Sequence, residues 1–290
     1  MYTDRWTHVG GVWLHFQDWP GPRGAETVLL LHGLTQQSHV FDPVAARLGS
    51  AYRCVALDFR GRGESEWAPP ATYAVAQYVG DVLGVLGELR LAAVHVIGIS
   101  LGGLVALSLA AVGRGRLRSL VLDDIGPEID PRGAARVAAS TAAAPGGFPT
   151  LEAAIAWARS QYPFLAARPL EEVAETVRWA VRPVPGGTWR LKFDPAIARA
   201  PRPPAAVAEA TRRAWWWAFA RLRCPILLIR GAESDVLSAE TAAAMQSRQP
   251  GLHRVDVPGV GHAPTLTEPA SVAALARFYG PPGLAGWASS

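Results

Sequence analysis

The chain is poor in several residue types, and each shortage excludes a class of protein. Its 290 residues include only two cysteines, Cys54 and Cys224, too few for a disulfide framework, so we expect a reduced, cytoplasmic protein. The first residues contain an acid, a tryptophan and a histidine, where a secretory signal needs a basic patch and an apolar core. No uncharged apolar run reaches the roughly 18 residues of a membrane span. The sequence therefore predicts a soluble chain with no membrane partner.

Charged residues are also scarce, and nearly all of them are Arg, Asp or Glu. They make up 18% of the chain, and Lys192 is the only lysine among the 28 basic residues. The formal net charge is +4, but no basic run alternates with aromatic residues as in nucleic-acid-binding segments. We therefore expect no nucleic-acid partner, and arginines scattered over a solvated surface. A hydrophobic content of 50% is typical of a compact, enzyme-like body.

Short apolar runs recur along the chain and alternate with helical patterns. Their hydrophobicity is continuous, as in strands that helices cover on both faces. The expected parallel strands are residues 27–33, 52–59, 93–99, 117–125 and 224–231, with a last run at 253–257 and an early antiparallel strand within 10–19. The expected helices are residues 38–48, 72–90, 101–113, 238–248 and 268–279. This order predicts an α/β fold with a mostly parallel, doubly wound sheet.

One long segment interrupts this alternation. Residues 127–222 are rich in Ala, Arg, Trp and Pro and contain no convincing strand run. A separate small domain is one interpretation. We favour an inserted helical cap, because the strand series resumes at residue 224. The expected division is a core of residues 1–126 and 223–290 with a cap of residues 127–222.

A tight cluster of small residues surrounds a single hydroxyl between an expected strand and an expected helix. Residues 98–102 read Gly-Ile-Ser-Leu-Gly, which matches the G-x-S-x-G nucleophile elbow in its required strand-to-turn-to-helix setting. The small neighbours leave room for a strained backbone that exposes Ser100 beside a helix N-terminus. Partial positive charge there favours a developing oxyanion. Ser100 is therefore the candidate nucleophile.

A serine nucleophile needs a base and a carboxylate that orients this base. His262 lies in the Gly-rich loop that follows the run at 253–257, so we expect it to be the base. Asp235, directly after the strand ending at 231, is the preferred acid and gives the chain order Ser, Asp, His. Asp124, at the end of the strand 117–125, is the alternative acid. Asp123 and Glu233 are lesser candidates.

The oxyanion also needs hydrogen-bond donors. His32 and Gly33 end the first central strand, where backbone N–H groups can turn toward the site. We expect the amides of Leu34 and Leu101 to form the oxyanion hole. His32 is expected to brace this loop as a buried structural histidine and to take no part in the chemistry.

Together these motifs resemble the α/β-hydrolase superfamily, in the branch with a helical cap after the sixth strand. The matching segments are HG at 32–33, DFRGRGES at 58–65, GISLGG at 98–103, LDDIGPE at 122–128, RGAESD at 230–235 and GVGHAP at 259–264. The resemblance implies a serine hydrolase with a catalytic triad, no metal and no organic cofactor. It also implies that residues 58–61 form a structural turn.

The substrate is less well defined by the sequence. The expected cap carries six tryptophans, which favour a largely apolar pocket: Trp157, Trp179, Trp189, Trp215, Trp216 and Trp217. We expect a small-molecule ester of small to medium size, cleaved through an acyl-enzyme in the manner of a carboxylesterase. An enol-lactonase and a C–C bond hydrolase of ring-cleavage products are alternatives within the family. A non-catalytic sensor of a small ligand is an alternative from another class.

Overall fold

The computed structural model describes residues 1–113, 115–166, 168–201 and 203–280. Its centre is an eight-stranded sheet in the order β1-β2-β4-β3-β5-β6-β9-β10. The strands are β1 (Thr3–Val9), β2 (Val12–Trp19), β3 (Thr27–Leu31), β4 (Arg53–Leu57), β5 (Val94–Ile99), β6 (Leu117–Asp123), β9 (Ile226–Gly231) and β10 (His253–Val257). The six strands from β4 to β10 in this order are parallel to one another. Strand β2 pairs antiparallel with both of its neighbours, β1 and β4. The predicted α/β fold with a mostly parallel sheet is thereby confirmed.

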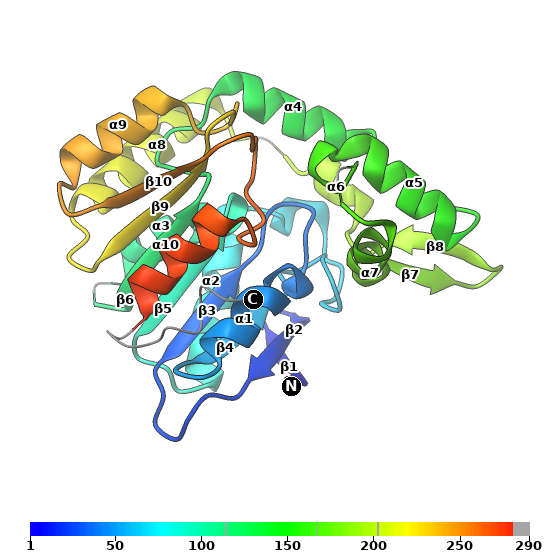
Figure 1. Cartoon of the computed structure of the whole chain (residues 1–290), viewed down its shortest axis with the longest axis horizontal. Coiled ribbons are helices and arrows are strands. Elements are labelled where there is room, and N and C mark those ends of the chain that lie inside the picture. Colours follow the sequence, from blue (N-terminus) through cyan, green and yellow to red (C-terminus); the bar gives the residue numbers. More distant parts are fainter. Residues whose placement is uncertain (114, 167, 202, 281–290) are drawn as a thin grey trace.

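The predicted strands are continuous apolar runs because both faces of the sheet are covered. Every residue of β3 and of β9 is buried. On one face pack α1 (Asp42–Leu48) and α10 (Pro269–Tyr279), and on the other α2 (Val75–Glu88), α3 (Leu101–Val112), α8 (Ala205–Ala220) and α9 (Ala239–Arg248) (Figure 1). Strand β1 was not predicted. It is mostly exposed at the edge of the sheet, so its sequence lacks an apolar run.

The chain between β6 and β9 forms a lobe beside the sheet, drawn mainly in green in Figure 1. The lobe contains α4 (Pro131–Ala142), α5 (Leu151–Gln161), α6 (Pro163–Ala166), α7 (Leu170–Ala180), β7 (Val181–Val184), β8 (Thr188–Leu191) and the 3-10 helix η3 (Pro195–Arg199). Strands β7 and β8 form an antiparallel hairpin. The segment is mostly helical, as expected, but the expectation that it contains no strand is wrong. The hairpin turns at Gly186 and Gly187, both with positive φ, a conformation that glycine adopts without strain.

The end of the expected cap also differs from the prediction. Helix α8 lies within residues 127–222, but it packs against α3 on the face of the sheet. The indole N–H of Trp215 donates to Ser108 Oγ of α3 over 2.7 Å. Helix α8 therefore belongs to the layer that covers the sheet. The last ten residues of the expected core, 281–290, lie outside the described residues.

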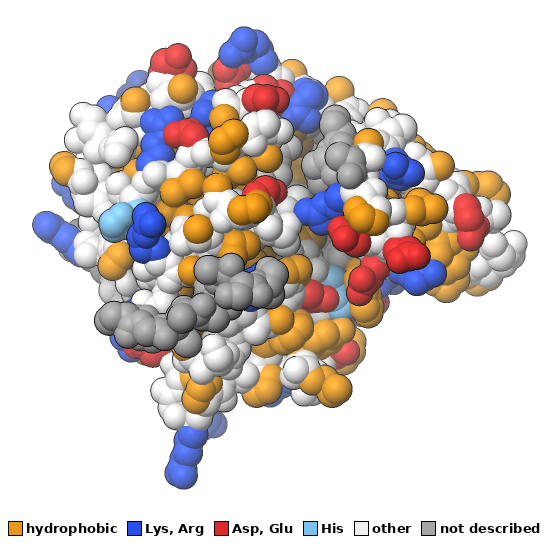
Figure 2. Space-filling view, viewed as in Figure 1, with side chains coloured by type: hydrophobic (Ala, Val, Ile, Leu, Met, Phe, Trp, Pro, Cys, Tyr) orange, Lys and Arg blue, Asp and Glu red, His pale blue; other side chains and the backbone are white. Residues whose placement is uncertain are grey.

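The distribution of charge on the surface matches the absence of basic runs in the sequence. Figure 2 shows arginine and acidic side chains interspersed over this face of the molecule. Ion pairs join exposed side chains of opposite charge, among them Arg118 with Glu26, and the exposed Arg5 with the less exposed Asp18. Within the described ranges, no helix combines the length and the apolar character needed to cross a membrane.

Candidate active site

Ser100 occupies a strained turn between β5 and α3. Its φ of 48° and ψ of −110° lie where a non-glycine residue is rarely found. A Cβ at Gly98 would collide with the backbone of residues 102 and 103, and a Cβ at Gly102 would collide with the carbonyl oxygen of Leu31. Glycine is therefore required on both sides of the serine. The turn leaves the hydroxyl at the carboxyl edge of the sheet, beside the N-terminus of α3.

His262 joins this hydroxyl to a carboxylate. Nε2 of His262 lies 2.9 Å from Ser100 Oγ, and Nδ1 lies 2.7 Å from Oδ2 of Asp124. Because a carboxylate can only accept, Nδ1 carries the proton and Nε2 is free to accept from the serine. The Asp124 side chain is fully buried, and that of His262 is 9% exposed. The structure thus brings together the predicted nucleophile and the predicted base in the arrangement of a catalytic triad.

The acid in this arrangement is Asp124, the alternative in the sequence analysis, and the preference for Asp235 is corrected. Asp124 follows β6, and its carboxylate also accepts from the backbone N–H of Gly231 and from Ser234 Oγ. Asp235 follows the neighbouring strand β9, but Arg136 of α4 binds both of its oxygens. The Arg136 guanidinium also lowers the pKa of Asp235. Asp235 therefore links the lobe to the sheet and makes no hydrogen bond to His262.

Asp123 and Glu233, the two lesser candidates for the acid, make no hydrogen bond to the His262 imidazole. Glu233 is exposed. Asp123 is fully buried, and neither of its carboxylate oxygens has a hydrogen-bond partner among the described residues. Burial, with the nearby charges of Asp124 and Glu268, raises the pKa of Asp123 well above its usual range. Because both oxygens lack a hydrogen-bond partner and burial disfavours the anion, Asp123 is not the carboxylate that pairs with the histidine.

The two amides expected to form the oxyanion hole come from the start of α3 and from the loop after β3. Leu101 is the first residue of α3, so its N–H has no acceptor within the helix. Leu34 lies just after β3, in the loop of residues 32–38. In the part of the chain that the structure describes, neither N–H donates a hydrogen bond to another group. Both amides are therefore available to an oxyanion.

His32 is a buried structural histidine, in the place that the sequence suggested. Its side chain is fully buried, and the N–H of Phe59 donates to Nε2 over 3.1 Å. Nδ1 therefore carries the proton and donates to the carbonyl of Gly33 over 2.7 Å. Burial lowers the pKa of His32 to about 4. The imidazole is consequently neutral at physiological pH and braces the 32–38 loop.

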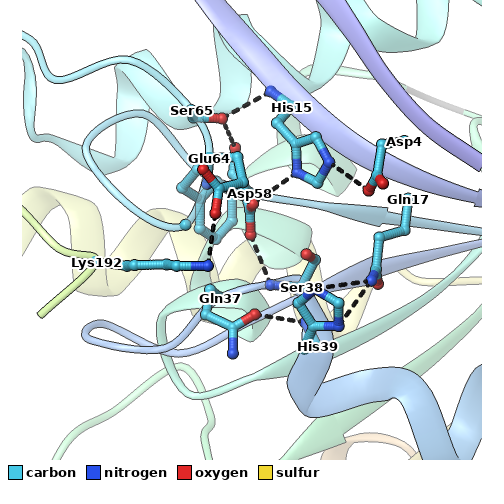
Figure 3. Close-up of polar contacts among 12 residues, drawn as sticks. Asp4, His15, Gln17, Gln37, Ser38, His39, Asp58, Glu64, Ser65 and Lys192 are labelled. Atoms are coloured by element: carbon cyan, nitrogen blue, oxygen red, sulfur yellow. Dashed lines mark hydrogen bonds and ion pairs between the residues drawn. The ribbon is translucent and has the colours of Figure 1, made fainter. Parts of the chain in front are cut away.

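Asp58 begins a second loop, residues 58–65, that packs against the 32–38 loop. The Asp58 carboxylate is buried and accepts from the N–H groups of Ser38 and Glu64 over 2.6 and 2.9 Å. It also contacts Nδ1 of His15 at 2.7 Å, and Nε2 of His15 contacts Asp4 at 2.9 Å (Figure 3). No signal in the sequence predicted this network, because its partners come from four separate segments.

The tryptophans expected to line one pocket are distributed over several places. Trp157 packs on Phe148, and Trp179 stacks on His39 of the sheet domain with ring centroids 3.6 Å apart. Trp215, Trp216 and Trp217 lie on α8, which packs against α3. A cavity of about 220 Å³ between α4, β8 and η3 has no tryptophan in its lining. The three tryptophans of α8 therefore belong to the layer that covers the sheet, and the largely apolar pocket expected in the cap stays a prediction.

The site contains no arrangement typical of a metal centre. Within the described ranges, no group of three or more His, Cys, Asp or Glu side chains could hold a metal ion. The geometry joins a serine hydroxyl, an imidazole and a buried carboxylate by hydrogen bonds. This arrangement can perform nucleophilic acyl transfer.

Comparisons with known proteins place the chain among hydrolases. The model of the alpha/beta hydrolase family matches residues 28–275. A 3-hydroxybutyrate-oligomer hydrolase from Cupriavidus necator is 35% identical over 270 residues, covering 91% of this chain and 92% of that protein. A 2-(acetamidomethylene)succinate hydrolase from Mesorhizobium japonicum is 29% identical over 81% of each chain. The crystal structure of an α/β hydrolase from Novosphingobium aromaticivorans has a TM-score of 0.86 and 33% identity, over 96% of this chain and 98% of that one.

Proposed function

Because the chain belongs to the α/β-hydrolase family and is a hydrolase, we propose that it is a serine hydrolase that cleaves carboxylic esters through an acyl-enzyme. The hydrogen-bonded series from Ser100 Oγ through His262 to Asp124 carries this proposal. The three residues come from three separate turns or loops at one edge of the sheet. Asp124 lies 24 positions after Ser100 in the sequence, and His262 lies 162 positions after it. A purely structural histidine would not need to accept from a serine held in a strained turn.

In the first half-reaction, Nε2 of His262 removes the hydroxyl proton as Ser100 Oγ attacks the ester carbonyl. The Asp124 carboxylate stabilises the imidazolium through the proton on Nδ1. The carbonyl oxygen becomes an oxyanion, which accepts from the N–H groups of Leu34 and Leu101. The N-terminus of α3 adds a favourable field at the same place.

The first half-reaction ends with the histidine acting as an acid. His262 gives its Nε2 proton to the leaving alcohol, which departs and leaves the acyl group on Ser100. In the second half-reaction, a water molecule loses a proton to Nε2 and attacks the acyl carbon. Collapse of the second tetrahedral intermediate releases the acid, and Oγ regains its proton. Every step uses only these side chains, two backbone amides and water.

For the substrate, we propose a small-molecule ester of small to medium size, with short oligoesters of hydroxy acids as the first compounds to test. The support is the relative named for hydrolysis of 3-hydroxybutyrate oligomers, because the match extends over 92% of that protein. An enol-lactone and a C–C ring-cleavage product require the same triad, so they belong in the same substrate panel.

The test is a kinetic survey of the full chain with Ser100→Ala as the control. We expect hydrolysis of 3-hydroxybutyrate dimers, trimers or p-nitrophenyl esters, and a loss in kcat on the order of 10⁴ or more in the variant. A fluorophosphonate should add one mass equivalent to Ser100 and none to the variant. Substantial esterase activity in Ser100→Ala would overturn the serine mechanism, and activity confined to the C–C substrate would overturn the ester assignment.

A further inference from the structure

The 58–65 loop contacts the 32–38 loop at three points, all close to the amide of Leu34. Phe59 N–H donates to His32, Arg62 Nε donates to the Leu34 carbonyl over 2.9 Å, and Asp58 accepts from Ser38 N–H. Resting on the serine mechanism proposed above, we propose that Arg62 is a positioning residue that holds the Leu34 N–H toward the oxyanion. Arg62 touches neither Ser100 nor His262 and acts through the 32–38 loop.

The argument begins with the two peptide groups that flank Leu34. In a trans peptide the C=O and the following N–H point in opposite directions. The Gly33 carbonyl accepts from His32 Nδ1, and this contact sets the direction of the Leu34 N–H. The next carbonyl, that of Leu34 itself, accepts from Arg62. With both carbonyls held, the Leu34 backbone cannot rotate without breaking a buried hydrogen bond.

The surroundings of the Arg62 guanidinium show that it is fixed in place. The side chain is fully buried, and Nη1 donates to Tyr78 Oη over 2.7 Å and to the Arg60 carbonyl over 2.9 Å. Its Cζ atom lies 5.1 Å from the centre of the Tyr78 ring and 5.5 Å from that of Tyr73. No carboxylate forms an ion pair with it among the described residues. A buried cation without an ion pair is costly, and burial, which lowers the pKa of Arg62, outweighs the opposing effects of Tyr78, Tyr73 and Asp194.

The charge of Arg62 lies one peptide away from the expected oxyanion donor. Negative charge develops on the substrate oxygen only in the transition state, so a fixed positive charge nearby favours that state over the bound substrate. Arg62 therefore affects the reaction in two ways. Its hydrogen bond orients the Leu34 peptide, and its charge stabilises the oxyanion through a dry, low-dielectric environment.

The 58–65 loop is itself anchored from several sides. Asp58 ties its start to Ser38 and to His15 (Figure 3). The lobe contacts its middle, where Gly63 N–H donates to the Lys192 carbonyl over 2.7 Å and the Lys192 ammonium pairs with Glu64 over 2.6 Å. These contacts make the loop a rigid base from which Arg62 can hold Leu34.

The test compares Arg62→Lys and Arg62→Gln with the wild-type chain on one ester substrate. Arg62→Lys keeps the charge without the planar fork, and Arg62→Gln keeps one donor without the charge. We expect kcat to fall by about 10- to 100-fold in both, with KM changed by less than about threefold. A trifluoromethyl ketone, whose adduct with Ser100 carries an oxyanion, should bind more weakly by the same factor as kcat/KM. Titration of active sites with a fluorophosphonate corrects for any inactive fraction.

Arg60 supplies a matched control from the same loop. It is as buried as Arg62, but it pairs with Asp81 and makes no contact with the 32–38 loop. The double variant Arg60→Met, Asp81→Leu removes this pair without leaving a lone charge. We expect it to retain kcat and trifluoromethyl ketone affinity within about threefold of the wild type.

Three results would overturn the proposal. They are an unchanged kcat in the Arg62 variants, an unchanged affinity for the trifluoromethyl ketone despite a lower kcat, and an equal loss of both in the Arg60 control. If neither Arg62 variant folds, Tyr78→Phe decides, because it removes one contact of the guanidinium. It should lower kcat and inhibitor affinity together by about two- to fivefold, and no parallel loss would refute the role of Arg62. Loss of the serine mechanism would be seen separately in Ser100→Ala.

Discussion

Nδ1 of His262 lies 2.7 Å from Oδ2 of Asp124, a residue 138 positions earlier in the chain. Asp235, which is only 27 positions from His262, has both carboxylate oxygens bound by Arg136. Strands β6 and β9 are neighbours in the sheet, so both acids emerge at the same edge. The packing of the loops that follow these strands therefore decides which acid meets His262.

Replacement of the two acids should separate their roles. Asp124→Asn removes the acceptor that fixes the His262 tautomer, so kcat should fall on the order of 10⁴-fold. Asp235→Asn breaks a partly exposed ion pair with Arg136 and should change kcat by less than about threefold. Steady-state kinetics on one ester measure both variants. The opposite ranking would return the catalytic role to Asp235.

His32 should make unfolding depend on pH in acid. Its folded pKa is about 4, below the value of roughly 6.5 in an unfolded chain. The unfolded state therefore takes up a proton first, so the free energy of unfolding falls as the pH decreases from roughly 6.5 to about 4. Urea titrations between pH 4 and pH 7 should show this loss in the wild type. The loss should be smaller in His32→Gln, and identical slopes in both proteins would contradict a buried neutral imidazole.

His15 should have the opposite effect at higher pH. Burial disfavours its charged form, but the hydrogen bonds and charges of Asp58 and Asp4 outweigh burial, and the pKa of His15 is raised. Its contribution to stability is fully present below the unfolded value of roughly 6.5 and is lost as the pH rises through the folded pKa. In His15→Gln this decline should disappear from denaturation curves above pH 6.5. NMR titration of the imidazole provides a direct check, and a folded pKa below that of a free histidine would exclude the effect.

Asp123 is a site where a substitution should stabilise the protein. Its carboxyl has a raised pKa and no hydrogen-bond partner among the described residues. The unfolded chain ionises at roughly pH 3.9, so this group destabilises the fold increasingly as the pH rises above that value. Asp123→Leu should raise the free energy of unfolding at pH 7 by about 1–3 kcal/mol, with a smaller gain at pH 4.

The catalytic parameters provide the control for this substitution. The Asp123 carbonyl accepts from Ser100 N–H through the backbone, and a leucine preserves that bond. We therefore expect kcat within about threefold of the wild type. A variant less stable than the wild type at pH 7 would show that the carboxyl has a stabilising partner.

Much of the fold could be predicted because the central strands are buried on both faces. Continuous apolar runs such as β3 follow from that burial alone. Strand β1 and the β7–β8 hairpin were missed, because most of their residues are not buried and their sequences alternate weakly. Helix α8 has a helical sequence, but nothing local distinguishes a helix of the lobe from one that packs on α3.

In the candidate site, too, some features follow from a local sequence pattern and others depend on contacts between remote segments. Gly98 and Gly102 mark the elbow at Ser100 because only glycine fits there, so a local pattern was sufficient. Arg62 and Asp58 lie in a motif that the sequence marked only as a turn. Their contacts with the 32–38 loop join segments more than 15 positions apart. A local sequence pattern cannot predict such contacts.

The sequence by itself determined the central strands, the helices between them and the serine turn, since each depends on hydrophobic runs or on neighbours in the chain. Only the tertiary structure decided which acid binds His262 and which arginine donates to the Leu34 carbonyl. Hydrogen bonds require contact within about 3 Å, and distances of that size between remote segments are fixed by how the whole sheet and its loops pack.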